Sequence, residues 1–217
     1  MSDKIRIGVR PSKLALKQAE EVQELLPWLQ MEVISIETTG DKDKKSRLID
    51  HEENNFFTYE IEQVLLHREI DVAIHSAKDL EKNIPEELAI VALTKSLSPW
   101  ESLVSRGNLT LDRLAQGAVI GTSSSKRKEA IARFRSDLVL KDIRGNIEER
   151  LEQLDKGDFD AVIIAHAALL RLRLEYRISQ IIPEDIIAPH PLQGRLAVQI
   201  RKDRIDLFEI FRRIHEK

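Results

Sequence analysis

The stretch "KIRIGVRPSKLALKQAEEVQELLPWLQMEVISIET" (residues 4–38) decides the fold class, because its hydrophobic pattern changes twice. Residues 4–9 are typical of a strand, and residues 12–26 place apolar side chains at helical spacing. Ser12 is a suitable N-cap for that helix. Residues 31–38 then alternate as a strand does. This succession of strand, helix and strand predicts an α/β protein.

The chain after this unit keeps the α/β pattern, with one interruption. Residues 39–55 are charged and lack periodicity, so they are expected to form a mobile loop. A helix is expected at residues 56–68, and strands are expected at 71–75 and 88–93.

A second α/β unit follows a break in the pattern at residues 94–102. Its expected strands are 118–122, 137–143 and 159–165, its expected helices are 124–134, 146–157 and 166–172, and a last strand within 187–200 precedes a helix at 204–217. The last strand and helix are expected to return to the first lobe.

The predicted organisation is therefore two α/β lobes. Domain 1 takes residues 1–95 plus 195–217 and domain 2 takes residues 99–188, with hinge crossings at 94–99 and 188–194. In such folds ligands bind at the carboxyl ends of the strands, in the cleft between the lobes.

Composition excludes several classes of protein. The 217 residues are 42% hydrophobic and 33% charged, with a net charge of −3, so no global basic field for nucleic acid exists. The absence of cysteine excludes disulfides, thiolate metal sites and any cofactor held through a cysteine thioether. The six histidines show no convincing ligand spacing, so no metal site is expected. No signal peptide or membrane helix is evident, which favours a cytoplasmic protein without a membrane partner.

Hydroxyl and cationic side chains gather where the predicted strands end. They are Arg10 and Ser12; Ser76 and Lys78; Thr122, Ser124, Lys126 and Arg127; Arg144 and Arg150; and Arg171. The free N–H groups at helix starts favour anions, and arginines form bidentate hydrogen bonds with carboxylates or phosphates. The pattern predicts a small polyanionic ligand. Taken singly, "SSSKRK" is more typical of a capped, exposed helix start, and "RGNIEER" is more typical of a turn before a solvated helix face.

Asp79 is the one carboxylate within this cationic set. Lys78 and Asp79 could form a solvated pair at a helix start, or Asp79 could transfer protons and stabilise a developing cation. His75 and His166 follow apolar strands and are interpreted as hydrogen-bonded buried histidines.

Taken together and in order, these segments resemble the porphobilinogen deaminase (hydroxymethylbilane synthase) family. The matching motifs are "IRIGVRPSKLALKQAE" (5–20), "TTGD" (38–41), "DVAIHSAKDL" (71–80), "GTSSSKR" (121–127), "DIRGNIEERLEQLDKGDFDAVIIA" (142–165) and "LQGRLAVQIR" (192–201). The resemblance implies two lobes similar to type II periplasmic binding proteins. It also implies the joining of four porphobilinogen units head to tail, with release of ammonia.

The resemblance also implies roles for individual residues. Asp79 matches the catalytic aspartate. The residues matching substrate and cofactor contacts are Arg10, Ser12, Ser76 and Lys78 in the first lobe, and Thr122, Ser124, Lys126, Arg127, Arg144, Arg150 and Arg171 in the second. Gln193 and Gly194 match the crossing segment, and Phe57 matches the aromatic that ends the mobile loop. Lys126 replaces the usual arginine, which keeps the charge and loses the bidentate geometry.

Three departures from the family pattern leave alternatives open. The family's dipyrromethane cofactor is held by a cysteine in a third domain, and these 217 residues contain no cysteine and no third domain. "EENNFF" (52–57) replaces the usual glycine-lysine-glycine before the phenylalanine, and Glu81 replaces a proline. The hypotheses are a short, monomeric deaminase that holds a dipyrromethane primer non-covalently, a binding protein or pseudoenzyme for pyrrole carboxylates, and an effector-binding module. A piece of a longer chain is a further alternative.

Overall fold

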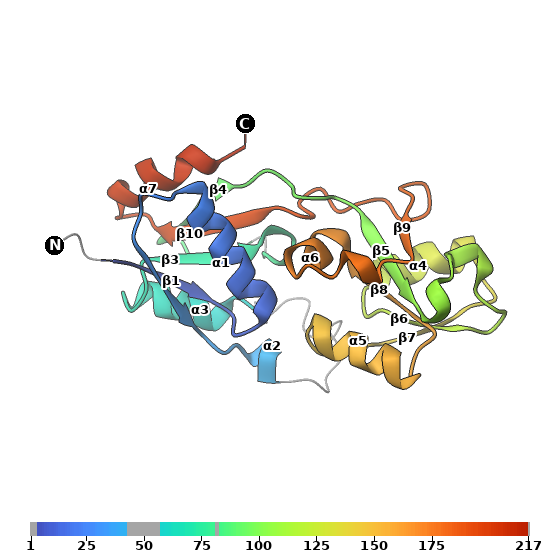
Figure 1. Cartoon of the computed structure of the whole chain (residues 1–217). Coiled ribbons are helices and arrows are strands. Elements are labelled where there is room, and N and C mark those ends of the chain that lie inside the picture. Colours follow the sequence, from blue (N-terminus) through green and yellow to red (C-terminus); the bar gives the residue numbers. More distant parts are fainter. Residues whose placement is uncertain (1–3, 43–56, 81–82, 217) are drawn as a thin grey trace. The chain divides into compact units, whose positions relative to one another are not determined.

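The structure, a computed structural model, describes residues 4–42, 57–80 and 83–216 (Figure 1). Its strands are β1 Ile5–Val9, β2 Met31–Ser35, β3 Val72–Ser76, β4 Leu88–Leu93, β5 Glu101–Ser105, β6 Val119–Gly121, β7 Val139–Lys141, β8 Ala161–Ala165, β9 Gln180–Ile182 and β10 Leu196–Arg201. Its α-helices are α1 Lys13–Leu25, α2 Thr39–Lys42, α3 Tyr59–Leu66, α4 Ser125–Phe134, α5 Ile147–Lys156, α6 His166–Arg171 and α7 Ile205–Phe211. The predicted α/β class is confirmed.

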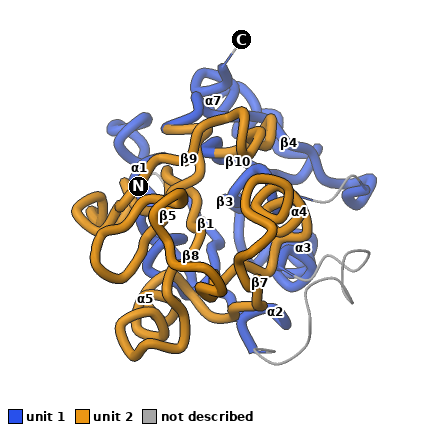
Figure 2. Tube along the Cα trace, turned by 90° about the vertical axis from the view of Figure 1, so that its right-hand side faces the viewer, with its two compact units in different colours: residues 1–43, 52–97, 194–217 blue, residues 44–51, 98–193 orange. Residues whose placement is uncertain are grey.

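The chain divides into two compact units, coloured separately in Figure 2. Within the described residues, the first unit comprises the chain up to Leu97 and from Gly194 onward, and the second comprises Ser98–Gln193. The hinge role expected for residues 94–99 and 188–194 stays a prediction.

Each unit contains one five-stranded mixed sheet. In the first, the order is β2-β1-β3-β10-β4, with β1 parallel to β2 and β3, and β10 antiparallel to β3 and β4. In the second, the order is β7-β6-β8-β5-β9, with β6 parallel to β7 and β8, and β5 antiparallel to β8 and β9. In each sheet the parallel strands have their carboxyl ends on the same side. The residues that follow β1 and β3 therefore lie together in the first unit, and those that follow β6, β7 and β8 lie together in the second.

Helices cover both faces of the first sheet. Successive side chains of a strand point to opposite faces, and here both faces carry apolar side chains that pack against helices. On one face, α1 and α7 pack with Val72, Ile74 and Val198 in one core cluster. On the other face, α3 packs with Ala73 and Leu88 in a separate cluster. The second unit has its own core around Leu103, Ile120 and Ile163.

Local capping places several helix starts at the strand ends. Ser12 Oγ accepts a hydrogen bond from the Ala15 amide at 3.2 Å, which confirms the predicted N-cap of α1. Asn146 and Glu149 form a reciprocal capping box at the start of α5, with both hydrogen bonds at 2.9 Å. Gly157 ends α5 as predicted, at a φ of 88° that favours glycine.

Three elements differ from the sequence prediction. Residues 39–42 form the short helix α2 where a loop was expected, because Asp41 accepts hydrogen bonds from Thr38 N at 3.1 Å and Thr38 Oγ1 at 2.8 Å. The rest of that expected loop, 43–55, lies outside the described residues. Strands β5 and β9 were not predicted. β5 begins with a buried glutamate, which masks the apolar pattern of the strand.

No helix in the described part of the chain combines the length and apolarity that crossing a bilayer requires.

Candidate functional site

A pocket opens in the first unit at the edge where the parallel strands β1 and β3 end. It is lined by Arg10, Ser12, Leu14, Ala15, Gln18, Phe57, Thr58, Ile74, His75, Ser76 and Asp79. Five predicted site residues therefore meet in one place, although they come from three separate parts of the chain. Lys78 is half-buried in the same 3-10 turn as Asp79, and is not among the described residues that line the pocket.

Arg10 is fixed in this pocket by two neighbours. Its Nε lies 3.1 Å and its Nη2 2.5 Å from Asp41 Oδ1, and its guanidinium stacks over Phe57 at 4.3 Å from the ring centre. Burial pushes the pKa of Asp41 up, but hydrogen bonds from Arg10 and Thr38 outweigh it and hold that pKa below its usual range. The pair keeps Arg10 oriented and about one-third exposed. Asp41 lies in the quoted motif "TTGD" and was not assigned a role from the sequence.

Gln18 is a second site residue that sequence reasoning missed. It is 4% exposed on α1, and its Nε2 donates a hydrogen bond to Ser76 Oγ at 2.8 Å. Because the Ser76 hydroxyl accepts this bond, its own hydrogen remains available to a ligand. The spacing of Gln18 on the buried face of α1 was the available signal.

Asp79 and His75 differ sharply in exposure. Asp79 is exposed at the end of the 3-10 turn Ala77–Asp79. His75 is buried, and burial lowers its pKa to about 4 although the hydrogen bond to Gln199 and the charge of Asp79 oppose that shift. The pocket therefore holds a carboxylate at its rim and a neutral imidazole in its wall. The interpretation of His75 as a hydrogen-bonded buried histidine is confirmed.

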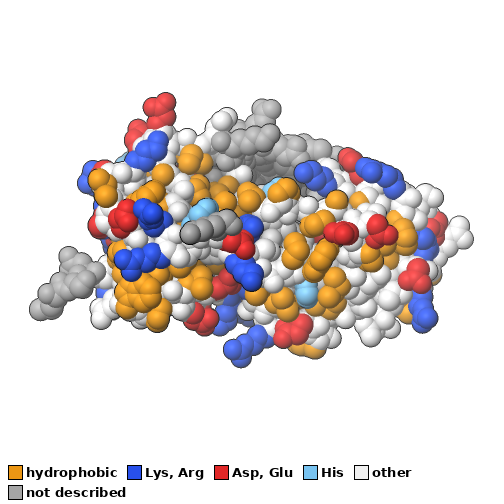
Figure 3. All heavy atoms as spheres, turned by 90° about the horizontal axis from the view of Figure 1, so that it is seen from above, with side chains coloured by type: hydrophobic (Ala, Val, Ile, Leu, Met, Phe, Trp, Pro, Cys, Tyr) orange, Lys and Arg blue, Asp and Glu red, His pale blue; other side chains and the backbone are white. Residues whose placement is uncertain are grey.

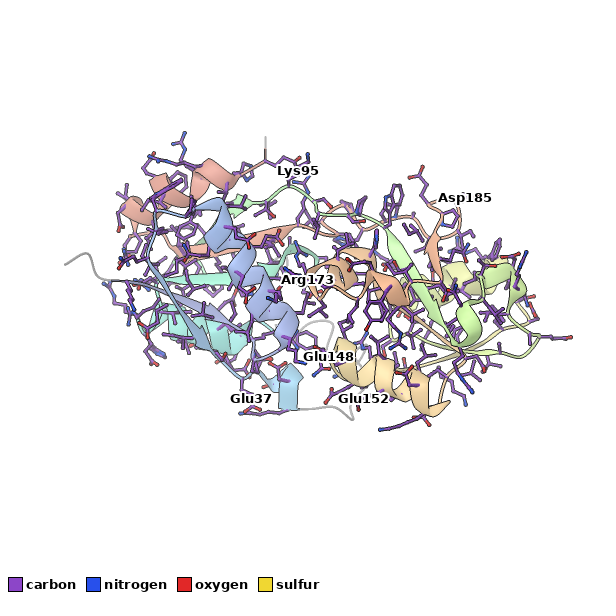
Figure 4. All side chains as sticks on the ribbon, in the orientation of Figure 1. Glu37, Lys95, Glu148, Glu152, Arg173 and Asp185 are labelled. Carbon is purple, nitrogen blue, oxygen red and sulfur yellow. The ribbon has the colours of Figure 1, made fainter. Side chains whose placement is uncertain are left out.

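The predicted residues of the second unit lie after the parallel strands β6, β7 and β8. Thr122 is buried after β6, Ser124 caps α4, and Lys126 is exposed on its first turn. Arg150 Nε donates to the carbonyl of Gly145 at 2.9 Å, which draws this arginine back over the start of α5. Glu148 lies on the same first turn (Figure 4). Arg144 precedes that helix, and Arg171 ends α6.

Arg127 has a protein partner that the sequence did not suggest. Its Nε and Nη2 donate to the two carboxylate oxygens of Glu101 at 2.9 and 2.7 Å, and its Nη1 donates to the carbonyl of Ile163 at 3.2 Å. The two charged side chains are only 13% and 8% exposed. The structure thus engages most of the guanidinium within the protein, and its predicted contact with a ligand carboxylate stays a prediction.

Gln193 is the last residue of the second unit, and Gly194 begins the C-terminal segment of the first unit. Gln193 is buried, and its Nε2 donates to the carbonyl of Trp100 at 3.3 Å. Gly194 has a φ of 78°, which a residue with a side chain adopts only with strain.

Surface charge is mixed on the face drawn in Figure 3, where basic and acidic side chains lie interspersed among apolar ones. Among the described residues, no three histidine or acidic side chains cluster as metal ligands do.

Solved structures show which fold the chain has. A periplasmic substrate-binding protein of an ABC transporter from Coxiella burnetii matches with a TM-score of 0.57 at 12% identity, covering 97% of this chain and 91% of that one. A putative methionine-binding lipoprotein from Bacillus subtilis also gives a TM-score of 0.57 at 12% identity, covering 99% and 91%. The chain thus has the two-lobed fold of periplasmic binding proteins.

The sequence comparisons identify the family. Residues 5–209 match the family model described as porphobilinogen deaminase, dipyromethane cofactor binding domain. Porphobilinogen deaminases from Syntrophomonas wolfei and Legionella pneumophila (strain Paris) are 41% and 37% identical, each over 98% of this chain and 71% or 70% of their own length. The chain belongs to the porphobilinogen deaminase family and spans about 70% of the length of these relatives.

Proposed function

We propose that this chain is a hydroxymethylbilane synthase, a transferase that joins porphobilinogen units head to tail and releases ammonia. Family membership over nearly the whole chain supports this activity. We place the reaction in the pocket that follows β1 and β3, because Asp79, Arg10 and Ser76 all line it.

The chemistry requires a group that manages positive charge. In each cycle the C–N bond of the aminomethyl group breaks, the bonding electrons leave with nitrogen as ammonia, and a cationic pyrrole remains. A ring carbon of the neighbouring pyrrole attacks this cation, and the ring then loses a proton. We assign the stabilisation of the cation and the proton transfers to the carboxylate of Asp79.

The other strand-end residues are proposed to bind the substrate's carboxylates. Arg10, Ser12, Ser76 and Lys78 serve the first unit, and Thr122, Ser124, Lys126, Arg144, Arg150 and Arg171 serve the second. Arginine and hydroxyl donors suit acetate and propionate side chains. Phe57 holds the plane of the Arg10 guanidinium.

We propose that these 217 residues hold the dipyrromethane cofactor without a covalent bond. The 217 residues contain no cysteine, so the thioether route does not fit them, whereas the strand-end cations fit the carboxylates of such a group. When bound, dipyrromethane supplies the free pyrrole end to which units are added.

Asp79→Asn tests the assignment. We expect ammonia release from porphobilinogen to fall at least about 100-fold, within the usual range for loss of an acid–base group, while binding changes little. Asp185→Asn is a matched surface control that should leave release unchanged, since Asp185 is exposed and does not line the pocket (Figure 4). Equal turnover by Asp79→Asn and the native chain would overturn the role of Asp79. Saturable binding without ammonia release by the native chain would instead indicate a binding protein.

We further propose that the protein works as a monomer in the cytoplasm on this small-molecule substrate, without nucleic-acid or membrane partners. The near balance of charges supports the absence of a nucleic-acid partner. Light scattering across a range of protein concentrations measures the oligomeric state.

A further inference from the structure

A line of buried polar side chains crosses the first unit from α3 to the pocket. Glu62 lies on α3, Gln199 on β10 and His75 on β3, and none is more than 6% exposed. Gln199 Nε2 donates to Glu62 Oε1 at 2.9 Å, and Gln199 Oε1 lies 2.9 Å from His75 Nε2. Buried polar groups keep such hydrogen bonds because breaking them without water is costly. The line therefore fixes the orientation of all three side chains.

The direction of each hydrogen bond follows from the groups at its ends. In the bond between Gln199 and Glu62 the amide nitrogen is the donor and Glu62 Oε1 is the acceptor, so Gln199 turns its carbonyl oxygen toward His75. That oxygen also only accepts, so His75 must carry its proton on Nε2. Burial keeps the pKa of His75 at about 4, and a neutral imidazole has one N–H group. Nδ1 of His75 is consequently a bare hydrogen-bond acceptor.

His75, which carries the Nδ1 acceptor, is the one of these three residues that lines the pocket. His75 lines the pocket with Asp79, Arg10 and Ser76, whereas Glu62 and Gln199 do not. Within the described part of the chain, no hydrogen bond occupies Nδ1 of His75. An uncharged acceptor beside an exposed carboxylate suits a ligand that presents N–H groups.

We propose that Nδ1 of His75 accepts a hydrogen bond from an N–H group of the bound pyrrole, and that Glu62 and Gln199 are positioning residues that lock the tautomer. This proposal rests on porphobilinogen being the substrate. It adds a neutral contact to the charged contact of Asp79, and a neutral imidazole does not repel the cation that forms when ammonia leaves.

Two substitutions of His75 separate a ligand contact from a structural one. In His75→Asn the amide reaches the place of Nδ1 and retains an acceptor there. In His75→Gln the amide reaches the place of Nε2 and retains the donor to Gln199. Calorimetry measures the Kd for porphobilinogen. We expect this Kd to stay within about threefold of the native value in His75→Asn. In His75→Gln we expect it to rise about tenfold or more, because one hydrogen bond to the ligand is lost. The reverse order would overturn the proposal.

Glu62→Gln tests whether Glu62 and Gln199 fix the tautomer of His75, at a position that does not line the pocket. The new amide can donate to the Gln199 oxygen, so Gln199 can turn over and present its N–H to His75. We expect ¹⁵N spectra of labelled histidine to show His75 change from the Nε2–H to the Nδ1–H form, with the Kd rising as in His75→Gln. His67→Gln, on an exposed histidine of the same unit, is the control that should change neither readout. A tautomer change without a change in Kd, or an unchanged tautomer, would contradict the lock.

A pyrrole carrying methyl in place of aminomethyl identifies the donor. If His75→Gln weakens its binding as it weakens that of porphobilinogen, the ring N–H is the donor. If the effect vanishes with the methyl compound, the aminomethyl group is the donor. A native chain that binds no porphobilinogen would overturn the proposed function together with this inference. Native-like binding and turnover by His75→Gln would overturn the inference alone.

Discussion

Arg127 and Glu101 depend on each other, because both charges are nearly buried. Glu101→Ala leaves the guanidinium without its bidentate partner, so we expect the free energy of unfolding to fall by about 3 kcal/mol or more, as for other broken buried pairs. Urea unfolding measures this change.

The double variant Glu101→Leu with Arg127→Met is the matched control, because it removes both charges at once. It should be more stable than Glu101→Ala alone. If Glu101→Ala costs less than about 0.5 kcal/mol, as for an exposed pair, the contribution assigned to this ion pair is wrong.

His75 makes stability depend on pH in a defined direction. Its folded pKa of about 4 lies below the ordinary value of 6.5, so between these values the unfolded state binds more protons. Stability therefore falls as the pH falls from about 6.5 toward 4, by up to roughly 1.4 kcal/mol per pH unit from this group.

The measurement is urea unfolding of native protein and His75→Asn at pH 7, 6 and 5. Subtracting the variant removes the contribution of the carboxylates common to both proteins. The native protein should lose more stability over this range, and parallel curves would show that His75 is not buried in its neutral form.

Sequence reasoning found site residues through their position at strand ends, and missed their partners. Arg10, Ser76 and Asp79 could be placed because each follows a strand. Gln18 could not be assigned to Ser76, since 58 residues separate them and the contact exists only once α1 packs on the sheet. The pairing of Glu101 with Arg127 likewise depends on the sheet order β6-β8-β5, which brings the start of β5 within reach of the helix that follows β6.

Among the elements, α5 has the most complete local start signal. Asn146→Ala removes the side chain that accepts from the Glu149 amide, so we expect a loss of about 1 kcal/mol in the free energy of unfolding. Glu152→Gln on the exposed side of the same helix is the control and should change stability by less than about 0.5 kcal/mol (Figure 4). Thermal or urea unfolding measures the loss of stability in each variant. Equal losses in Asn146→Ala and Glu152→Gln would contradict the capping role of Asn146.

Elements with strong periodicity were predicted, and those defined by tertiary contacts were not. Helix α1 and strand β4 agree closely with the patterns of residues 12–26 and 88–93. β9 has three residues and is stabilised by pairing with β5, so its own sequence carries too little pattern. The helix α2 depends on the hydrogen bonds of Asp41 and could not be read from periodicity.

At the scale of the whole molecule, the composition limits how these 217 residues can hold a pyrrole. Because the 217 residues lack cysteine, the chain unfolded in acid should have the mass of its amino acids alone. Native mass spectrometry after addition of porphobilinogen should instead show bound pyrrole, in a series spaced by one pyrrole unit. Additional mass that survives unfolding would show a covalent link through another residue type.

The position of β10 between β3 and β4 has a consequence for how the protein is made. A ribosome releases residues 72–93 long before residues 196–201, so the two earlier strands emerge without the strand that separates them. Residues 98–193 are contiguous in the chain and leave the ribosome before β10, so they can fold before the first sheet is complete. Until residues 196–201 have left the ribosome, the edge of β3 remains open to pairing with a wrong strand.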